Sequence, residues 1–199
     1  TGCEPRDLGS AMSAVRRALL FDIDGTLLMT GGAGQVAFER AFRECFGVAD
    51  SWGSVVPDGK TDAIIFYEIA QAALRRELLA HEYSQLCEKY LAYFPAALET
   101  SERFRLLPGV PELLERLRPR ADLLLGVATG NLESAAWDKL RRGKLDGYFR
   151  FGGFGSDAAK RAELVLRAIE RGRALAAARH LRPEDFIVIG DTPLDIAAA

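Results

Sequence analysis

Two aspartates at the end of an apolar segment carry the most specific chemistry in the sequence. Asp22 and Asp24 stand two residues apart, and Gly25 follows directly. At strand spacing the two carboxylates share a face, although a turn at Gly25 lets the second diverge. Neighbouring buried carboxylates repel each other, so such a pair needs a cation or a shifted pKa. A turn or helix cap requires only one aspartate, so the pair indicates a reactive or metal-binding site.

A second acidic cluster follows another apolar segment near residue 190. Asp191 ends that segment, and Asp195 falls in the first turn of a helix predicted to begin at Pro193. Both carboxylates can then face one cation, and hard oxygen ligands suit Mg²⁺. The preference of helix N-termini for acids explains Asp195 alone and leaves Asp191 unexplained. We therefore expect a magnesium site.

Two further segments have residues that suit phosphate binding. Thr129 ends an apolar segment and is followed by Gly130 and Asn131, so a hydroxyl and backbone N–H groups can meet an anion there. Asn131 has an equally good interpretation as the N-cap of the next helix. Lys160 and Arg161 open a later helix, where cations oppose the helix dipole. They are predicted to neutralise a phosphate, with a solvated charge pair as the alternative.

The segment around Lys60 resembles the end of a nucleotide-binding loop, but the resemblance fails in detail. Five residues separate Gly53 from Gly59, where that motif has four, and no strand precedes them. We predict instead that Thr61 caps a helix with Asp62 in its first turn. Lys60 would then lie beside a helix N-terminus, where it contacts substrate or is a plain surface lysine.

The elements that position these residues alternate along the second half of the chain. Short apolar runs predict buried strands, and apolar residues at helical spacing predict helices. The expected strands cover residues 17–24, 123–129 and 186–191, with a weaker fourth at 148–151. The expected helices cover residues 33–46, 61–79, 83–98, 111–117, 134–140 and 161–178. This order predicts an α/β fold with a doubly wound parallel sheet.

The helical block between the first two strands is too long for a single crossover. We predict that residues 30–106 form an inserted helical cap, with hinges at Gly31-Gly32 and Pro108-Gly109. Residues 17–29 and 107–199 would form the catalytic core, and residues 1–16 a flexible tail. Ligands of open α/β sheets bind at the carboxyl ends of the strands, where the acidic clusters would meet.

Composition narrows the classes of partner. The 199 residues include 49% hydrophobic and 27% charged residues, and the net charge is −2, so neither nucleic acid nor an anionic membrane is an expected partner. Cys3, Cys45 and Cys87 are far apart, which disfavours disulfides and zinc and favours the cytoplasm. No apolar run predicts a membrane span or a signal peptide. Nothing in the pattern indicates an oligomeric state.

Together the motifs resemble those of the haloacid dehalogenase superfamily, and most closely its phosphoglycolate phosphatase group. The resemblance rests on Asp22-Ile-Asp-Gly-Thr, Thr129, a basic residue at 160 or 161, and Gly190-Asp191-Thr-Pro-Leu-Asp195, in that order. It covers nearly the whole chain after Ala18. It implies the superfamily's α/β core with a helical cap between the first two motifs.

The resemblance also implies a role for each site residue. Asp22 would attack phosphorus to form an aspartyl phosphate, while Asp24 protonates the leaving alcohol and then activates water. Thr129 would hold the phosphoryl oxygens, helped by Gly130 and Asn131, and Lys160 or Arg161 would balance their charge. Asp191, Asp22 and the carbonyl of Asp24 would hold Mg²⁺, supported by Asp195. The implied activity is Mg²⁺-dependent hydrolysis of a small phosphorylated metabolite, similar to phosphoglycolate.

Two departures and two alternatives accompany this reading. The superfamily's lysine is commonly followed by proline, which is absent here, so either Lys160 or Arg161 could reach the phosphate. Superfamily members continue through another helix and strand past the position of Ala199. Asp24 argues against dehalogenases and phosphonatases, which lack this second acid. A β-phosphoglucomutase-type phosphomutase keeps both acids and is the first alternative; a non-enzymatic binding protein is the second.

Overall fold

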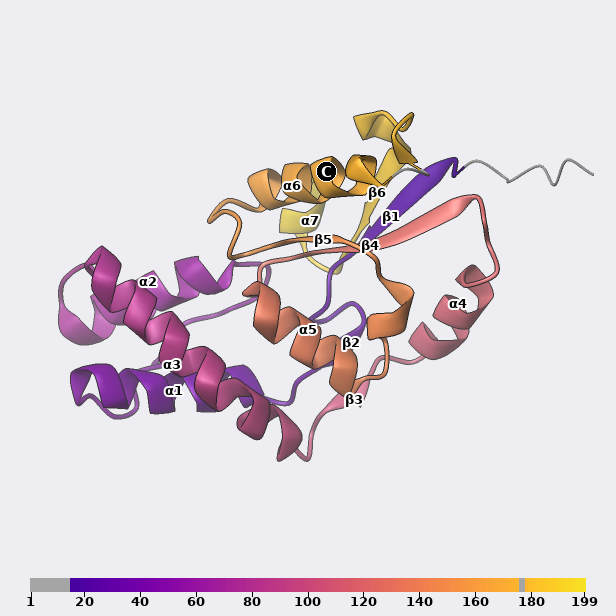
Figure 1. Ribbon diagram of the computed structural model, residues 1–199. Helices are drawn as coiled ribbons and strands as arrows, with labels where there is room; N and C mark the ends of the chain where they lie inside the picture. The colour runs from indigo at the N-terminus through magenta and orange to yellow at the C-terminus, as the bar shows by residue number, and fades with distance from the viewer. Residues whose placement is uncertain (1–14, 176–177) are drawn as a thin grey trace, which may run out of the picture.

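The computed structural model describes residues 15–175 and 178–199, and its centre is a parallel sheet. The strands are β1 (Arg17–Phe21), β4 (Leu123–Thr129), β5 (Gly152–Phe154) and β6 (Phe186–Ile189), in the order β5-β4-β1-β6 (Figure 1). Every neighbouring pair is parallel. The prediction of a doubly wound parallel α/β fold is confirmed.

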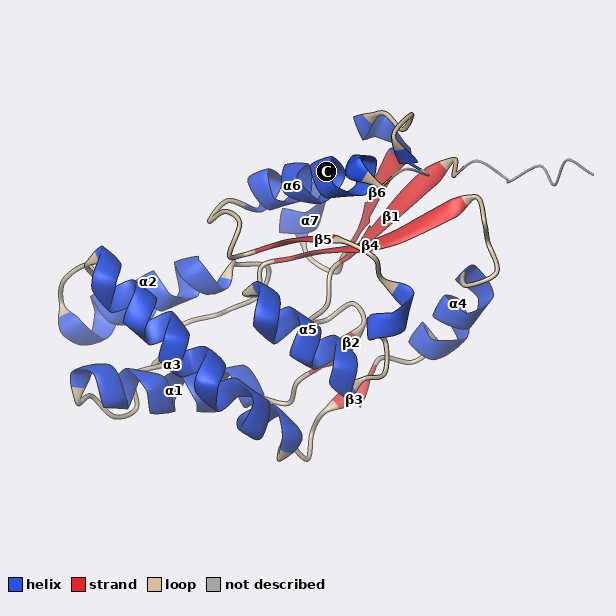
Figure 2. Ribbon diagram, in the orientation of Figure 1, coloured by secondary structure: helices blue, strands red, loops and turns tan. Residues whose placement is uncertain are grey.

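Helices cover both faces of the sheet, because side chains of buried strands alternate between the faces. One face packs on α6 (Arg161–Ala174), and the other on α4 (Val110–Leu117) and α5 (Glu133–Arg142), as Figure 2 shows. Leu20 of β1 joins the α6 cluster, whereas Phe21 joins the cluster with α4 and α5. Burial on both faces explains why the strands are apolar throughout.

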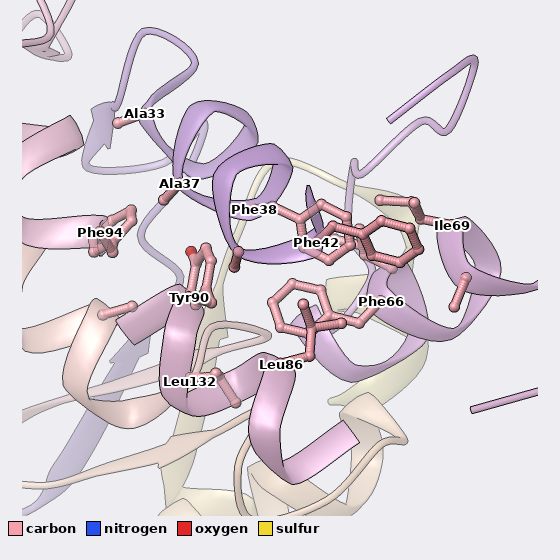
Figure 3. Close-up of a cluster of buried hydrophobic side chains, with 14 of the residues drawn as sticks. Ala33, Ala37, Phe38, Phe42, Phe66, Ile69, Leu86, Tyr90, Phe94 and Leu132 are labelled. Atoms are coloured by element: carbon pink, nitrogen blue, oxygen red, sulfur yellow. The ribbon is translucent and has the colours of Figure 1, made fainter. Parts of the chain in front are cut away.

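The remaining long helices form a separate helical unit: α1 (Ala33–Phe46), α2 (Asp62–Leu74) and α3 (Ala80–Glu99). Its core is aromatic, and Figure 3 shows Phe38, Phe42 and Phe66 gathered near Leu86. Two short strands, β2 (Leu28–Met29) and β3 (Arg105–Leu106), pair antiparallel. The chain leaves the core at β2 and returns to it at β3. Both crossings therefore lie side by side.

The structure corrects several predicted boundaries. The weak fourth strand is not at residues 148–151; it is β5, and Tyr148 ends a 3₁₀ helix (Asp146–Tyr148). The helix predicted over 61–79 ends at Leu74, because Arg75 adopts a left-handed conformation with φ of 59° that terminates it. The two-residue β2 and β3 were not predicted, since such short strands leave no periodic signal.

The last elements are a 3₁₀ helix (Pro183–Asp185) and α7 (Pro193–Ala198), which begins at the predicted Pro193. The helix predicted over 161–178 ends at Ala174, and residues 176–177 lie outside the described part. The predicted tail falls mostly on residues 1–14, which also lie outside it, whereas Val15 is buried. Among the described helices, none is both long and apolar enough to cross a membrane.

Candidate active site

The sheet brings the predicted site residues to one edge. Asp22 follows β1, Thr129 ends β4, and Asp191 lies just beyond β6. Because β1 lies between β4 and β6 and all three run parallel, their carboxyl ends meet. These residues line a cavity of about 720 Å³, whose other wall comes from the helical unit.

Three carboxylates form an acidic cluster at this edge. One oxygen from each of Asp22, Asp191 and Asp195 lies within 4.8 Å of the others. Asp195 is held by Thr192, whose backbone N–H and hydroxyl donate to its Oδ2 atom at 3.0 Å and 2.8 Å. The Thr26 hydroxyl donates to Oδ1 of Asp191 at 3.0 Å. Hydrogen bonds from Thr192 and Thr26 thus fix the two acids near β6.

The cluster fits a hard divalent cation. Its candidate ligands are all oxygens, which is the preference of Mg²⁺. The Oδ1 atom of Asp195 is buried and accepts no hydrogen bond of regular geometry among the described residues. Its charged partner is Arg161, so a single guanidinium faces three clustered carboxylates, and a divalent cation would balance the remaining negative charge.

Arg161 is the basic residue that reaches the acids. One guanidinium nitrogen lies 2.8 Å from Oδ2 of Asp22 and also contacts Asp195, while the other donates to the carbonyl of Gly59 at 3.2 Å. The Arg161 side chain is only 8% exposed. Lys160 is exposed and does not line the cavity. The structure therefore distinguishes the two basic candidates, and only Arg161 is placed beside Asp22.

Burial dominates the electrostatics of Asp22. Desolvation raises the pKa of this carboxyl from its ordinary 3.8 to about 6, against the opposing effect of Arg161. The neighbouring charges of Asp24 and Asp195 add to the increase in pKa. A cation beside these acids would favour the ionised carboxylate, which is the nucleophilic form.

The Thr129 loop differs from the prediction at Asn131. The N-cap of α5 is Leu132, not Asn131. The Asn131 side chain instead accepts a hydrogen bond from the Thr129 hydroxyl at 3.1 Å, and both residues are buried. The N–H of Leu132 donates to Oδ2 of Asp62 at 2.8 Å. A side chain from α2 thus occupies a donor at the start of α5 that a local cap would otherwise satisfy.

The start of α2 rests directly on this loop. The N–H of Asp62 donates to the carbonyl of Gly130 at 2.8 Å. Thr61 is the N-cap of α2, as predicted, and its hydroxyl also donates to the carbonyl of Ala159 at 3.0 Å. A Cβ atom on Gly130 would lie 2.4 Å from the carbonyl oxygen of Lys60. Only glycine allows so close an approach.

Comparison with a family model assigns the chain. The model described as haloacid dehalogenase-like hydrolase matches residues 19–199. This protein belongs to the haloacid dehalogenase-like hydrolases. Among curated proteins, a search with the sequence gave no match.

Solved structures share the fold of this haloacid dehalogenase-like hydrolase. A haloacid dehalogenase-like family protein from Streptococcus pneumoniae is 26% identical, with a TM-score of 0.58, covering 92% of this chain and 79% of its own. A predicted phosphoglycolate phosphatase from Haemophilus somnus is 19% identical, with a TM-score of 0.62 and coverages of 92% and 80%. A provisionally identified β-phosphoglucomutase from Bacteroides vulgatus is 19% identical, with a TM-score of 0.62 and coverages of 94% and 72%.

Three basic residues from the segment 30–106 line the hydrolase cavity. Lys60 lines the cavity together with Trp52, from the segment that connects α1 and α2. The ammonium group of Lys60 lies 2.6 Å from Oε2 of Glu68. Arg103 and Arg105, beside and within β3, also line the cavity. Sequence reasoning missed both arginines. Their only sequence signal is that they lie where the chain returns from the helical unit to the core. The antiparallel pairing of β2 with β3 holds this segment beside the cavity.

Lys139 is a third residue of the hydrolase that sequence reasoning missed. It lines the cavity from α5, and its Nζ atom lies 2.5 Å from Oδ2 of Asp24. On α5 it shares the buried face with Ala135, Ala136 and Leu140, at helical spacing. A lysine on an apolar helix face was therefore a readable signal, because lysine is rarely buried without a partner.

Proposed function

We propose that this hydrolase is a Mg²⁺-dependent phosphatase that cleaves a small phosphomonoester through an aspartyl phosphate on Asp22. The observation that carries the proposal is the cluster of Asp22, Asp191 and Asp195 beside Arg161, in which Asp22, Asp191 and Arg161 line one cavity. Phosphoryl transfer depends mainly on alignment and on stabilisation of charge, and this arrangement supports both.

The protein's own residues perform the proton and phosphoryl transfers. An Asp22 oxygen forms a bond to phosphorus as the bond to the leaving oxygen breaks, and the proton of Asp24 passes to that leaving oxygen. Water then gives its proton to Asp24 and attacks phosphorus, which releases phosphate and restores Asp22. Thr129, the N–H groups after Gly130 and the Arg161 guanidinium are the proposed contacts for the phosphoryl oxygens.

The proposed metal ligands are Asp22, Asp191 and the backbone carbonyl of Asp24, with Asp195 in support. When bound there, Mg²⁺ would reduce the repulsion between an anionic nucleophile and an anionic phosphate. The excess of clustered carboxylates over the single Arg161 guanidinium supports this assignment.

We propose that residues 30–106 act as a cap that selects the substrate. Their helices line the cavity opposite Asp22, and they contribute Lys60, Arg103 and Arg105 to its wall. Basic groups away from the reacting phosphate favour a substrate with a second anionic group, as phosphoglycolate has. The free thiols of Cys45 and Cys87 support a reducing, cytoplasmic location.

The decisive test of the proposal is Asp22→Asn, measured as phosphate release from a panel of phosphorylated metabolites with Mg²⁺. We expect a loss of at least ~10³-fold with an unchanged circular dichroism spectrum, because the nucleophile is gone. Asp122→Asn is the matched control, since Asp122 pairs with Arg120 and does not line the cavity. Turnover by Asp22→Asn within tenfold of the wild type would exclude Asp22 as nucleophile.

A sugar phosphomutase is the second candidate, and the two arginines favour it. Arg103 and Arg105 lie where they could hold a second phosphate, which a mutase must retain. A mutase also has to exclude water until a sugar hydroxyl arrives. Assays of one sugar phosphate for isomerisation and for phosphate release decide between them. Isomerisation faster than phosphate release would replace the phosphatase assignment. A binding protein without activity is disfavoured, because it needs none of the clustered acids.

A further inference from the structure

The ion pair between Lys139 and Asp24 is unusual in its asymmetry. The Lys139 side chain is 5% exposed, whereas that of Asp24 is 40% exposed and reaches the cavity. The Lys139 ammonium group also lies 5.7 Å from the ring centre of Phe94, which comes from α3. A buried lysine is costly unless it is paired, and Asp24 is its direct ion-pair partner, while the buried carboxyl of Asp62 is also close enough for Lys139 to lower its pKa. Both residues line the cavity, but the lysine is nearly fully buried and the acid is the more exposed partner.

We propose that Lys139 is a positioning residue that holds Asp24 in the orientation required for proton transfer. This inference rests on the proposed phosphatase function. Asp24 has two carboxyl oxygens, and Oδ2 accepts from Lys139. Among the described residues no side chain or backbone group bonds Oδ1. Lys139 therefore fixes one oxygen and leaves the other for the substrate.

The chemistry of the ammonium group determines where the proton of Asp24 is held. An ammonium group has three donors and no acceptor, so the oxygen that it contacts does not carry a proton toward it. Oδ1 is therefore the oxygen of Asp24 that is free to exchange a proton with the leaving oxygen of the substrate. As Oδ1 gives this proton to the leaving oxygen, negative charge develops on the carboxylate, and the adjacent cation stabilises it. A positioned general acid contributes about 10²–10⁴-fold to a rate.

A purely structural role makes a different prediction. If Lys139 only ties α5 to its surroundings, its loss should slow every substrate alike. If it positions the general acid, the loss should depend on the leaving group. An alkyl phosphate needs a proton on its leaving oxygen, whereas p-nitrophenyl phosphate releases a stable anion. The ratio kcat/KM includes only steps up to departure of the leaving group, so later hydrolysis of the aspartyl phosphate does not affect it.

The experiment compares Lys139→Met with the wild type on ethyl phosphate and on p-nitrophenyl phosphate, with Mg²⁺ present. We expect kcat/KM to fall ~30-fold or more for ethyl phosphate and less than ~3-fold for p-nitrophenyl phosphate. Lys89→Met is the matched control, because Lys89 pairs with Glu44 at 2.8 Å and does not line the cavity. It should change neither value. Equal losses on the two esters would overturn the positioning role.

A double-mutant cycle provides a second readout that structural damage would not reproduce. Added to Asp24→Asn, Lys139→Met should change kcat/KM for ethyl phosphate by less than ~2-fold, because the group it positions is already lost. Additive losses would contradict the inference. If Lys139→Met loses its native circular dichroism spectrum, Lys139→Arg decides instead. It keeps a donor for Oδ2 and should show a smaller loss that is still confined to ethyl phosphate, whereas equal losses would again overturn it.

The same assays separate this inference from the proposed function. A wild-type protein that releases phosphate from neither ester, nor from any metabolite tested, would overturn both. An active wild type with a loss independent of leaving group would overturn only the role of Lys139.

Discussion

At Asp22, burial and the proposed nucleophilic role have opposite requirements for the charge of the carboxyl group. A nucleophilic carboxylate must be ionised, yet burial raises its pKa to about 6. Arg161 offsets part of this effect through a contact at 2.8 Å. The charge of ionised Asp22 is therefore only partly compensated by Arg161. The free energy of unfolding should consequently depend on pH.

The first prediction concerns that stability without Mg²⁺. Between pH values near 3.8 and 6, folded Asp22 binds more protons than the unfolded chain, so its contribution to stability falls as pH rises. Asp22→Asn removes this destabilisation, which corresponds to about 3 kcal/mol at most. In urea unfolding with a chelator, the variant should be more stable than the wild type near neutral pH. The difference should vanish below the unfolded pKa, at roughly pH 3.

The control for this effect is Asp122→Asn. Asp122 is paired with Arg120, and a side-chain hydrogen bond lowers the pKa of Asp122, so its removal should bring no gain near neutral pH. An Asp22→Asn variant that is less stable than the wild type near neutral pH would contradict the expected sign.

Lys60 permits a test of substrate selection. We expect Lys60→Ala to lower kcat/KM more for the best natural substrate than for a generic aryl phosphate, because remote binding energy positions the reacting phosphate. Lys60 forms an ion pair with Glu68, so Glu68→Ala only frees the lysine. This variant should change kcat/KM less than Lys60→Ala does. Steady-state kinetics on both substrates measure it. Equal losses would remove Lys60 from substrate selection.

At the scale of elements, the start of α2 and the loop after β4 act as one surface. Asp62 and Gly130 are joined by a backbone hydrogen bond, and the side chain of Asp62 binds the N–H of Leu132. Arg161 contacts the carbonyl of Gly59 from the first turn of α6. The residues that line this part of the cavity are therefore positioned by three segments that are distant in sequence.

Gly130→Ala should disturb this junction. Its added methyl group would lie 2.4 Å from the carbonyl oxygen of Lys60, a backbone atom, so one segment has to shift. We expect destabilisation of about 1–3 kcal/mol, as for other overpacked sites, and a fall in kcat/KM of roughly tenfold or more, since small displacements slow reactions strongly. Urea unfolding and phosphate release measure the two effects.

Gly147→Ala is the matched control for this substitution. A Cβ atom there meets nothing within 4 Å, so the variant should resemble the wild type. If Gly130→Ala keeps wild-type stability and activity, the close approach of the two segments is not required.

At the scale of the whole molecule, a bound cation should link the carboxyl ends of β1 and β6, through Asp22 and Asp191. We expect phosphate release to cease in excess chelator and to return with Mg²⁺. Mg²⁺ should also raise the thermal midpoint of the wild type, because a ligand that binds the folded state stabilises it. This shift should be smaller in Asp191→Asn and unchanged in Asp122→Asn. Full activity in excess chelator would refute the metal assignment.

Much of the fold follows from local pattern. The apolar runs that become β1, β4 and β6, and the helix at residues 33–46, need no distant information, because periodicity and glycine positions are local. The same reasoning predicted that the strands run parallel and that their polar ends, with Asp22, Thr129 and Asp191, share one edge. The sequence by itself thus determined the chemistry at that edge.

Only the tertiary structure decided which side chains from elsewhere reach it. Nothing local distinguishes Arg161 from Lys160; the difference arises because only Arg161 turns inward from α6 toward Asp22. Asn131 does not cap α5, because the helix begins one residue later and the Asn131 side chain accepts from the Thr129 hydroxyl instead. Lys139 found its partner 115 positions away, at Asp24. Contacts between residues so far apart depend on packing of whole elements, which leaves no periodic trace along the chain.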